Sequence, residues 1–247
     1  MIVQWNSSPD ICFIVFIFTE DFQVDGPNQT LPAVSGGDLV LPCSVKPSVS
    51  VEGMTVEWFR LDQQGQASLV HLYKDGKDQN SKQIQSYRDR TNLFKDNLKM
   101  GNASLKLSSV QVSDEGDYKC FIQSGSGYDD ALIQVIVRAI GKAPRIISEG
   151  VRWDGAISLV CESEGWWPEP VLEWLDSQGK LLNAETTEIH QGPNGFGVKR
   201  RLVAYRRDTE HYVCRLTQKD ERTALEREVE MDTTFHISGR TLIFLVV

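Results

Sequence analysis

One arrangement of cysteine, tryptophan and tyrosine occurs twice along this chain. The first copy consists of Cys43, Trp58, Tyr118 and Cys120, and the second of Cys161, Trp174, Tyr212 and Cys214. In each copy the tyrosine stands two positions before the last cysteine. A repeat of this length in a chain of 247 residues predicts two tandem domains of the same architecture.

The spacing is typical of an immunoglobulin-like sandwich, in which two antiparallel sheets pack face to face. There the cysteines bridge the sheets, the tryptophan packs against the bridge, and the tyrosine forms a corner by hydrogen bonding to the backbone. We therefore expect an all-β chain with these disulfides, core tryptophans and tyrosine corners: Cys43–Cys120, Cys161–Cys214, Trp58, Trp174, Tyr118 and Tyr212. Bridges across such long loops contribute roughly 4 kcal/mol each to stability. They also indicate an oxidising compartment.

The two copies predict sandwiches of different size. The segment between Trp58 and Tyr118 has room for two additional strands, which indicates a variable-type domain of nine strands. The shorter segment between Trp174 and Tyr212 indicates a constant-type domain. We expect the variable-type domain at residues 21–138 and the constant-type domain at residues 139–232.

Both ends of the chain contain short apolar runs. Residues 11–18, which include the odd Cys12, lack a preceding basic residue and a typical cleavage site. Because the cysteine pattern requires secretion, residues 1–20 are interpreted as a signal peptide or its remnant; the alternative is an incorrect gene start. Residues 242–247 are apolar but fall short of the ~20 residues of a spanning helix. Residues 233–247 are interpreted as a stem and the start of a truncated transmembrane helix, the alternative being a chance apolar tail.

Strand alternation predicts which side chains of the first domain point away from its core. With Trp58 and Cys120 pointing inward, their sequence neighbours point outward. If Val70 and Leu72 are also in the core, His71 and Tyr73 point outward as well. The predicted binding face consists of Phe59, Leu61, Tyr73 and Phe121, with Tyr128 above them in a loop. Exposed aromatic clusters usually mark interaction sites; the alternative is packing under the second domain or under long neighbouring side chains.

Other residues of the first domain are candidates for a structural salt bridge and for glycosylation. Arg90 and Asp114 form the pair that commonly closes a variable-type domain, so we expect a structural salt bridge between them. Asn28 and Asn102 begin N-x-[ST] tripeptides and are candidate glycosylation sites. A glycan at either position would exclude a protein partner there.

Composition and motifs argue against catalysis and nucleic-acid binding. The formal net charge is −8, whereas nucleic-acid-binding domains are usually basic. The four histidines are scattered, and the chain lacks H-E-x-x-H, G-x-S-x-G and P-loop motifs. The five cysteines contain no C-x-x-C pair. We expect no enzyme activity, cofactor or metal site. The basic run 199–201 is interpreted as a solvated edge, the alternative being a patch for an acidic glycan or partner.

Longer stretches of the chain resemble a known family. Four of them are similar to the variable domain of butyrophilins and of myelin oligodendrocyte glycoprotein: residues 22–27, 70–78, 90–94 and 114–120. The run Gly-Trp-Trp-Pro-Glu-Pro at 165–170, followed by Glu173 and Trp174, resembles the butyrophilin constant domain, where Gly-Trp-Tyr-Pro-Glu-Pro is usual. The resemblance covers roughly residues 22–232. We also expect a cis peptide bond before Pro168, in the turn that this run forms.

The resemblance implies a membrane-anchored glycoprotein on the external side of the plasma membrane. Such a protein would bind an unidentified receptor on T cells and modulate, most often inhibit, their activation and cytokine production. In this interpretation the aromatic face of the first domain binds the receptor and the second domain raises it from the membrane. The alternative is a homophilic adhesion glycoprotein that forms a homodimer through the same face.

Overall fold

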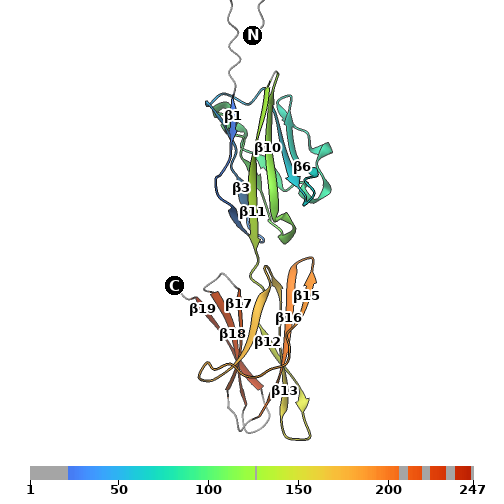
Figure 1. The fold of residues 1–247 in the computed structure, drawn as a ribbon, viewed down its shortest axis with the longest axis vertical. Helices are drawn as coiled ribbons and strands as arrows, with labels where there is room; N and C mark the ends of the chain where they lie inside the picture. The colour runs from blue at the N-terminus through green and yellow to red at the C-terminus, as the bar shows by residue number, and fades with distance from the viewer. Residues whose placement is uncertain (1–21, 126, 206–210, 219–222, 232–236, 246–247) are drawn as a thin grey trace, which may run out of the picture. The chain divides into compact units, whose positions relative to one another are not determined.

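The computed structural model describes residues 22–125, 127–205, 211–218, 223–231 and 237–245. The predicted signal segment, residues 1–20, lies outside these ranges. The described residues form two β-sandwiches, each closed by one disulfide (Figure 1). Short 3-10 helices interrupt the connections of the first sandwich at η1 (Asn80–Lys82), η2 (Gln85–Tyr87), η3 (Lys95–Met100) and η4 (Val112–Asp114).

The first sandwich contains strands β1 to β11. Their bounds are β1 (Gln23–Asp25), β2 (Leu31–Val34), β3 (Leu39–Leu41), β4 (Ser44–Lys46), β5 (Thr55–Leu61), β6 (Ala67–Lys74), β7 (Lys77–Asp78), β8 (Thr91–Leu93), β9 (Leu105–Leu107), β10 (Gly116–Ser124) and β11 (Gly127–Arg138). One sheet has the order β2-β11-β10-β5-β6-β7, and a second has the order β3-β9-β8. Strand β1 pairs with β4. Figure 1 shows β10 and β11 running side by side along the first sandwich.

These strands correspond to the nine of a variable-type domain. Its first strand is divided, because β1 pairs antiparallel with β4 whereas β2 pairs parallel with β11. The second is divided into β3 and β4 at Pro42 and Cys43. Strands β6 and β7 fill the segment between Trp58 and Tyr118 that the sequence analysis assigned to two additional strands.

The core of the first sandwich surrounds the Cys43–Cys120 disulfide, which joins residues 77 positions apart. Trp58 is fully buried, and its Nε1 donates a hydrogen bond to the Ala103 carbonyl (3.2 Å). Tyr118 is also fully buried, and its hydroxyl lies 2.8 Å from that of Tyr87. Because a buried hydroxyl needs a partner, this contact stabilises the tyrosine in the core.

The second sandwich contains strands β12 to β19. Their bounds are β12 (Arg145–Val151), β13 (Ile157–Trp166), β14 (Pro170–Asp176), β15 (Glu188–Gly192), β16 (Gly195–Ala204), β17 (His211–Gln218), β18 (Thr223–Met231) and β19 (Ile237–Leu245). One sheet has the order β12-β13-β16-β15, and the other has the order β14-β17-β18-β19. The first of these sheets is the four-stranded sheet of a constant-type domain, as the short segment between Trp174 and Tyr212 predicts.

The core of the second sandwich repeats that of the first. The Cys161–Cys214 disulfide joins residues 53 positions apart, and Trp174 is fully buried beside it. The Tyr212 hydroxyl donates to the Tyr205 carbonyl (2.7 Å), which is the backbone contact of a tyrosine corner. The peptide bond before Pro168 is cis, as the sequence analysis expects.

The last described segment differs from its sequence-based interpretation. Residues 237–245, assigned above to a stem and the start of a membrane helix, form the extended strand β19. This strand pairs antiparallel with β18, from Ile237 opposite Met231 to Leu245 opposite Thr223. An open strand edge is a template for pairing, and a stretch rich in Ile, Thr, Leu and Phe favours strands. None of the helices described is long and apolar enough to cross a membrane.

Candidate functional site

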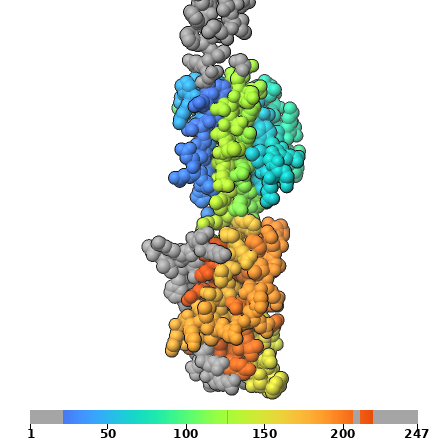
Figure 2. Space-filling view, in the orientation of Figure 1, coloured from blue at the N-terminus to red at the C-terminus, as the bar shows by residue number. Residues whose placement is uncertain are grey.

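The candidate site is the outward side of the six-stranded sheet, which we call the front face. It is the side of this sheet that points away from the Cys43–Cys120 disulfide, and its strands lie at the surface in Figure 2. Its members are Glu57, Phe59 and Leu61 on β5, Leu69 and Leu72 on β6, Asp117, Lys119 and Phe121 on β10, and Tyr128, Asp130, Leu132 and Ile136 on β11.

The register of β5 with β10 places their members of the front face. Trp58 is paired with Cys120, and both side chains are fully buried. Paired residues of an antiparallel ladder point to the same side, and successive residues alternate. The pairs Lys119 with Phe59 and Phe121 with Glu57 therefore point outward. Phe59, Leu61 and Phe121 are half-buried there, which agrees with the predicted orientation of all three.

Two residues of β11 contact residues of β10 and so belong to the front face. The Tyr128 ring packs on the Phe121 ring, with centroids 5.5 Å apart, and 70% of Tyr128 remains exposed. The Lys119 Nζ lies 3.3 Å from a carboxylate oxygen of Asp130. Both contacts start from outward-pointing residues of β10. They therefore place Tyr128 and Asp130 on the front face, with Tyr128 at the start of β11.

Two apolar members of the front face were missed by the sequence analysis. Leu132 is 60% exposed and Ile136 is 44% exposed. They alternate along β11 with the buried Ile133, Val135 and Val137. This alternation is visible in the sequence, but the analysis selected exposed aromatic side chains and left aliphatic ones out.

The prediction that Tyr73 belongs to this face is wrong. Tyr73 is 4% exposed and is paired with the buried Val56, and its hydroxyl donates to the Glu52 carbonyl (3.1 Å). The register of β5 with β6 shifts beside Trp58, so that His71 is opposite Trp58 whereas Leu69 is opposite Phe59. Val70 is the extra residue of this β-bulge. A bulge reverses the alternation beyond it, which turns His71 and Tyr73 inward.

The inward-turned His71 lies in a buried polar cluster. Its Nδ1 is 2.9 Å from the Thr91 hydroxyl, and its Nε2 is 3.2 Å from Asp78, which also pairs with Lys95 (2.8 Å). Burial lowers the pKa of His71 below its ordinary value, although the hydrogen bond and charge of Asp78 act in the opposite direction. Burial alone would raise the pKa of Asp78, but hydrogen bonds from Lys95 and His71 outweigh it and lower the pKa. This cluster joins β6, β7 and β8 to η3, and the imidazole at its centre is 2% exposed.

The other predicted residues of the first domain lie away from the front face. Asp114 is 2% exposed and accepts a hydrogen bond from the Gln111 N–H (2.7 Å). The Arg90 guanidinium lies 5.6 Å from the Tyr87 ring centroid. The salt bridge between Arg90 and Asp114 remains a prediction.

The two candidate glycosylation sites differ in exposure. Asn28 is exposed, in the connection between β1 and β2. Asn102 is half-buried, and its side-chain oxygen accepts a hydrogen bond from the Ser104 N–H (2.9 Å). Glycosylation at either position remains a prediction.

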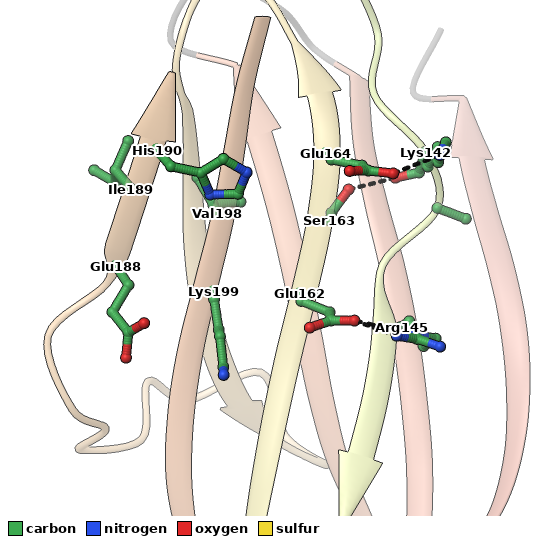
Figure 3. A pocket seen from close by; sticks show the side chains of 11 residues that line it. Lys142, Arg145, Glu162, Ser163, Glu164, Glu188, Ile189, His190, Val198 and Lys199 are labelled. Carbon is green, nitrogen blue, oxygen red and sulfur yellow. Dashed lines mark hydrogen bonds and ion pairs between the residues drawn. The ribbon is translucent and has the colours of Figure 1, made fainter. Parts of the chain in front are cut away.

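The second sandwich carries a shallow groove of about 680 Å³ on the outward side of the sheet β12-β13-β16-β15 (Figure 3). Its charged lining residues are Lys142, Arg145 and Lys199, and Glu162, Glu164 and Glu188. Figure 3 shows Glu162 paired with Arg145 and Glu164 beside Lys142. The hydrogen bond from Lys142 holds the pKa of Glu164 below its ordinary value. Because the basic and acidic side chains are balanced, this groove does not select a charged ligand.

The basic run at 199–201 is divided between the two sides of β16. Arg200 donates to the Leu172 carbonyl (2.9 Å), whereas Arg201 forms ion pairs with Glu149 (2.7 Å) and Glu185 (3.0 Å). The hydrogen bonds that Arg201 donates to both carboxylates raise its pKa. The run therefore does not form one basic stripe. In the part of the chain that the structure describes, no cluster of three His, Cys, Asp or Glu side chains has the arrangement of a metal site.

Two family models match consecutive parts of the chain. The immunoglobulin V-set domain matches residues 26–138, and the butyrophilin subfamily 3 member A2-like Ig-C domain matches residues 140–227. Together with the two disulfide-closed sandwiches, these matches define an immunoglobulin-superfamily protein with a variable-type domain followed by a butyrophilin-type constant domain.

Comparisons with individual proteins narrow this class. The chain is 34% identical over 213 residues to butyrophilin subfamily 1 member A1 of Bos taurus, which covers 83% of the chain and 40% of that protein. It is 33% identical over 214 residues to selection and upkeep of intraepithelial T-cells protein 1 of Macaca fascicularis, which covers 84% of the chain and 59% of that protein. The crystal structure of bovine butyrophilin matches with a TM-score of 0.68 at 26% identity, over 91% of this chain and 99% of the other. The chain belongs to the butyrophilin and butyrophilin-like family.

The chain spans less than two thirds of the length of these two curated relatives. The similarity covers their immunoglobulin domains, which are extracellular and displayed at the cell surface in this family.

Proposed function

We propose that this protein is a cell-surface ligand whose front face binds a protein receptor on T cells and modulates their activation. Inhibition of T-cell receptor signalling and cytokine production is the proposed outcome. Membrane anchoring, with both sandwiches on the external side, is part of the same proposal. Family membership supports an immune-regulatory role, and one similar protein is named for the selection and upkeep of intraepithelial T cells.

The observation that carries this proposal is the exposed apolar surface of the front face. Tyr128, Leu132 and Ile136 are 70%, 60% and 44% exposed on a single strand. The Tyr128 ring packs on the half-buried ring of Phe121 on β10, and the half-buried Phe59 lies one strand further, on β5. Exposed apolar side chains gathered on one face mark interaction sites, and aromatic side chains are frequent anchors of interfaces.

The test is the staining of resting and activated T cells with fluorescent multimers of the chain. The variant Tyr128→Ala with Leu132→Ala removes two exposed contacts without opening the core, so its melting temperature should remain that of the wild type. We expect its staining to fall by at least about tenfold, because interface anchors of this type contribute ~1.4 kcal/mol or more.

The matched control is Leu181→Ala with Ile189→Ala in the second sandwich, where these side chains are 60% and 47% exposed. Its staining should equal that of the wild type. Equal staining by the front-face variant would contradict the proposed face. If no T cells are stained while the chain forms dimers in sedimentation, the homophilic adhesion function replaces the ligand function.

A further inference from the structure

Glu57 lies at the centre of the front face, among apolar side chains. In the ladder of the sheet it is opposite Phe121 on β10 and Leu72 on β6, and Phe59 follows on the same side of β5. The Glu57 side chain is half-buried, and Leu72 beside it is 5% exposed. A carboxylate is thus held on β5 between two apolar neighbours.

The carboxylate of Glu57 has no ion-pair or hydrogen-bond partner among the described residues. The basic residues diagonal to Glu57 in the ladder are Lys119 on β10 and Lys74 on β6, and neither forms an ion pair with it. Lys119 is directed to Asp130 instead, with its Nζ 3.3 Å and 3.4 Å from the two carboxylate oxygens. Direct contact with the Glu57 carboxylate is therefore left to solvent.

Covering this face would remove that solvent. A partner that packs on Phe121, Tyr128 and Leu132 would also exclude water from Glu57, and an unpaired buried carboxylate is strongly unfavourable. A partner with a basic side chain at this point would instead gain a charge-assisted hydrogen bond. An arginine fits best, because its planar guanidinium binds a carboxylate through two parallel hydrogen bonds.

We infer that Glu57 is the specificity-determining residue of the front face, and that the receptor presents an arginine or lysine flanked by apolar side chains to it. This inference rests on the proposed function. It adds the chemistry of the partner, namely a basic side chain within an apolar contact surface. The charge selects among partners that would otherwise fit the same apolar face.

The same charge disfavours a second copy of this chain as the occupant. A twofold axis through the centre of the front face would bring each Glu57 against the Glu57 of the other copy, because such an interface uses the same patch twice. Asp117, which is exposed on the same side of β10, adds a further carboxylate. Juxtaposed like charges oppose that pairing, whereas a basic heterologous partner is attracted.

The test uses multimers of the complete chain on resting and activated T cells, with Glu57→Gln and Glu57→Lys. Glu57→Gln keeps the shape of the side chain and removes its charge. We expect staining to fall about tenfold for Glu57→Gln and about a hundredfold for Glu57→Lys, since the second variant places like charges together. Between about 0.05 and 0.5 M salt, wild-type staining should weaken more than that of Glu57→Gln.

The matched control is Glu169→Gln, which makes the same charge change at an exposed position of the second sandwich. Its staining should equal that of the wild type. Unchanged staining by both Glu57 variants, when Tyr128→Ala with Leu132→Ala has lost staining, would overturn the role of Glu57 and leave the proposed function intact. Absence of wild-type staining from all T cells would overturn both. Self-association of the wild type that Tyr128→Ala with Leu132→Ala abolishes, without any staining of T cells, would identify a second copy as the occupant and overturn the inference.

Discussion

The two sandwiches carry the same disulfide, tryptophan and tyrosine, yet their outward sheet faces differ. On the front face of the first sandwich, Tyr128 and Leu132 are mostly exposed and Glu57 is unpaired among the described residues. On the sheet β12-β13-β16-β15 of the second, the strands present opposite charges to one another, as in the ion pairs of Arg145 with Glu162 and Arg201 with Glu149. A paired charged face is satisfied by its own neighbours. An apolar face with an unpaired carboxylate gains from a partner, and this difference places the binding function on the first sandwich.

The largest expected effect comes from removing one bridge at a time. Either Cys43→Ala with Cys120→Ala or Cys161→Ala with Cys214→Ala should lower the free energy of unfolding of its own sandwich by roughly 4 kcal/mol. The bridge that joins residues 77 positions apart constrains a longer loop than the one that joins residues 53 positions apart. Chain entropy therefore makes the first loss larger by about 0.3 kcal/mol.

Calorimetry of each variant measures the loss in the free energy of unfolding, and staining of T cells measures the effect on binding. Loss of the first bridge should abolish staining, because the front face is built on the strand that contains Cys120. Loss of the second bridge should lower the melting temperature of the second sandwich. Staining measured at low temperature should remain unchanged. Staining that depends on the second bridge alone would reverse the assignment of the binding face.

A smaller effect is expected from pH, through His71 in the first sandwich. The pKa of His71 is lowered from 6.5 by burial, so the unfolded chain binds a proton there more readily than the folded one. Unfolding therefore takes up a proton below pH 6.5, and the free energy of unfolding falls as the pH falls towards 5. In His71→Gln, urea unfolding should depend less on pH across this window than in the wild type.

His190→Gln is the control for this titration. His190 lies on β15 of the second sandwich, so its replacement should leave the pH dependence of unfolding of the first sandwich unchanged. An unaltered pH dependence in His71→Gln, with a shift in His190→Gln instead, would show that the buried cluster of the first sandwich is not the titrating element.

Strand alternation predicted the outward orientation of side chains correctly where the pairing of strands is regular. It placed Phe59, Leu61 and Phe121, because β5 and β10 pair without interruption from Thr55 to Leu61. It failed for Tyr73, because one extra residue in β6 reverses the orientation of those that follow. No turn residue marks that bulge in the sequence, since Val70 is itself a good strand former.

The remaining differences concern residues whose composition allows two structures. The apolar residues at 242–245 are compatible with a membrane helix and with a strand, and the structure pairs them with β18. Leu132 and Ile136 have the composition of core residues, and only their alternation along β11 with the buried Ile133, Val135 and Val137 marks them as exposed. That Glu57 has no ion pair could not be predicted from the sequence either, because it depends on Lys119 being directed to Asp130.

A glycan placed on each outward face in turn tests the central claim most directly. Gln134→Asn with Ile136→Thr creates an acceptor on the front face, and Glu188→Asn with His190→Thr creates one on the second sandwich; all four positions are exposed. A bulky glycan blocks protein contact over the surface that it covers. With occupancy verified by the mass of each chain, the account predicts that the front-face glycan abolishes staining of T cells and the other glycan does not. Retained staining with the front face glycosylated, and lost staining with the second sandwich glycosylated, would contradict it.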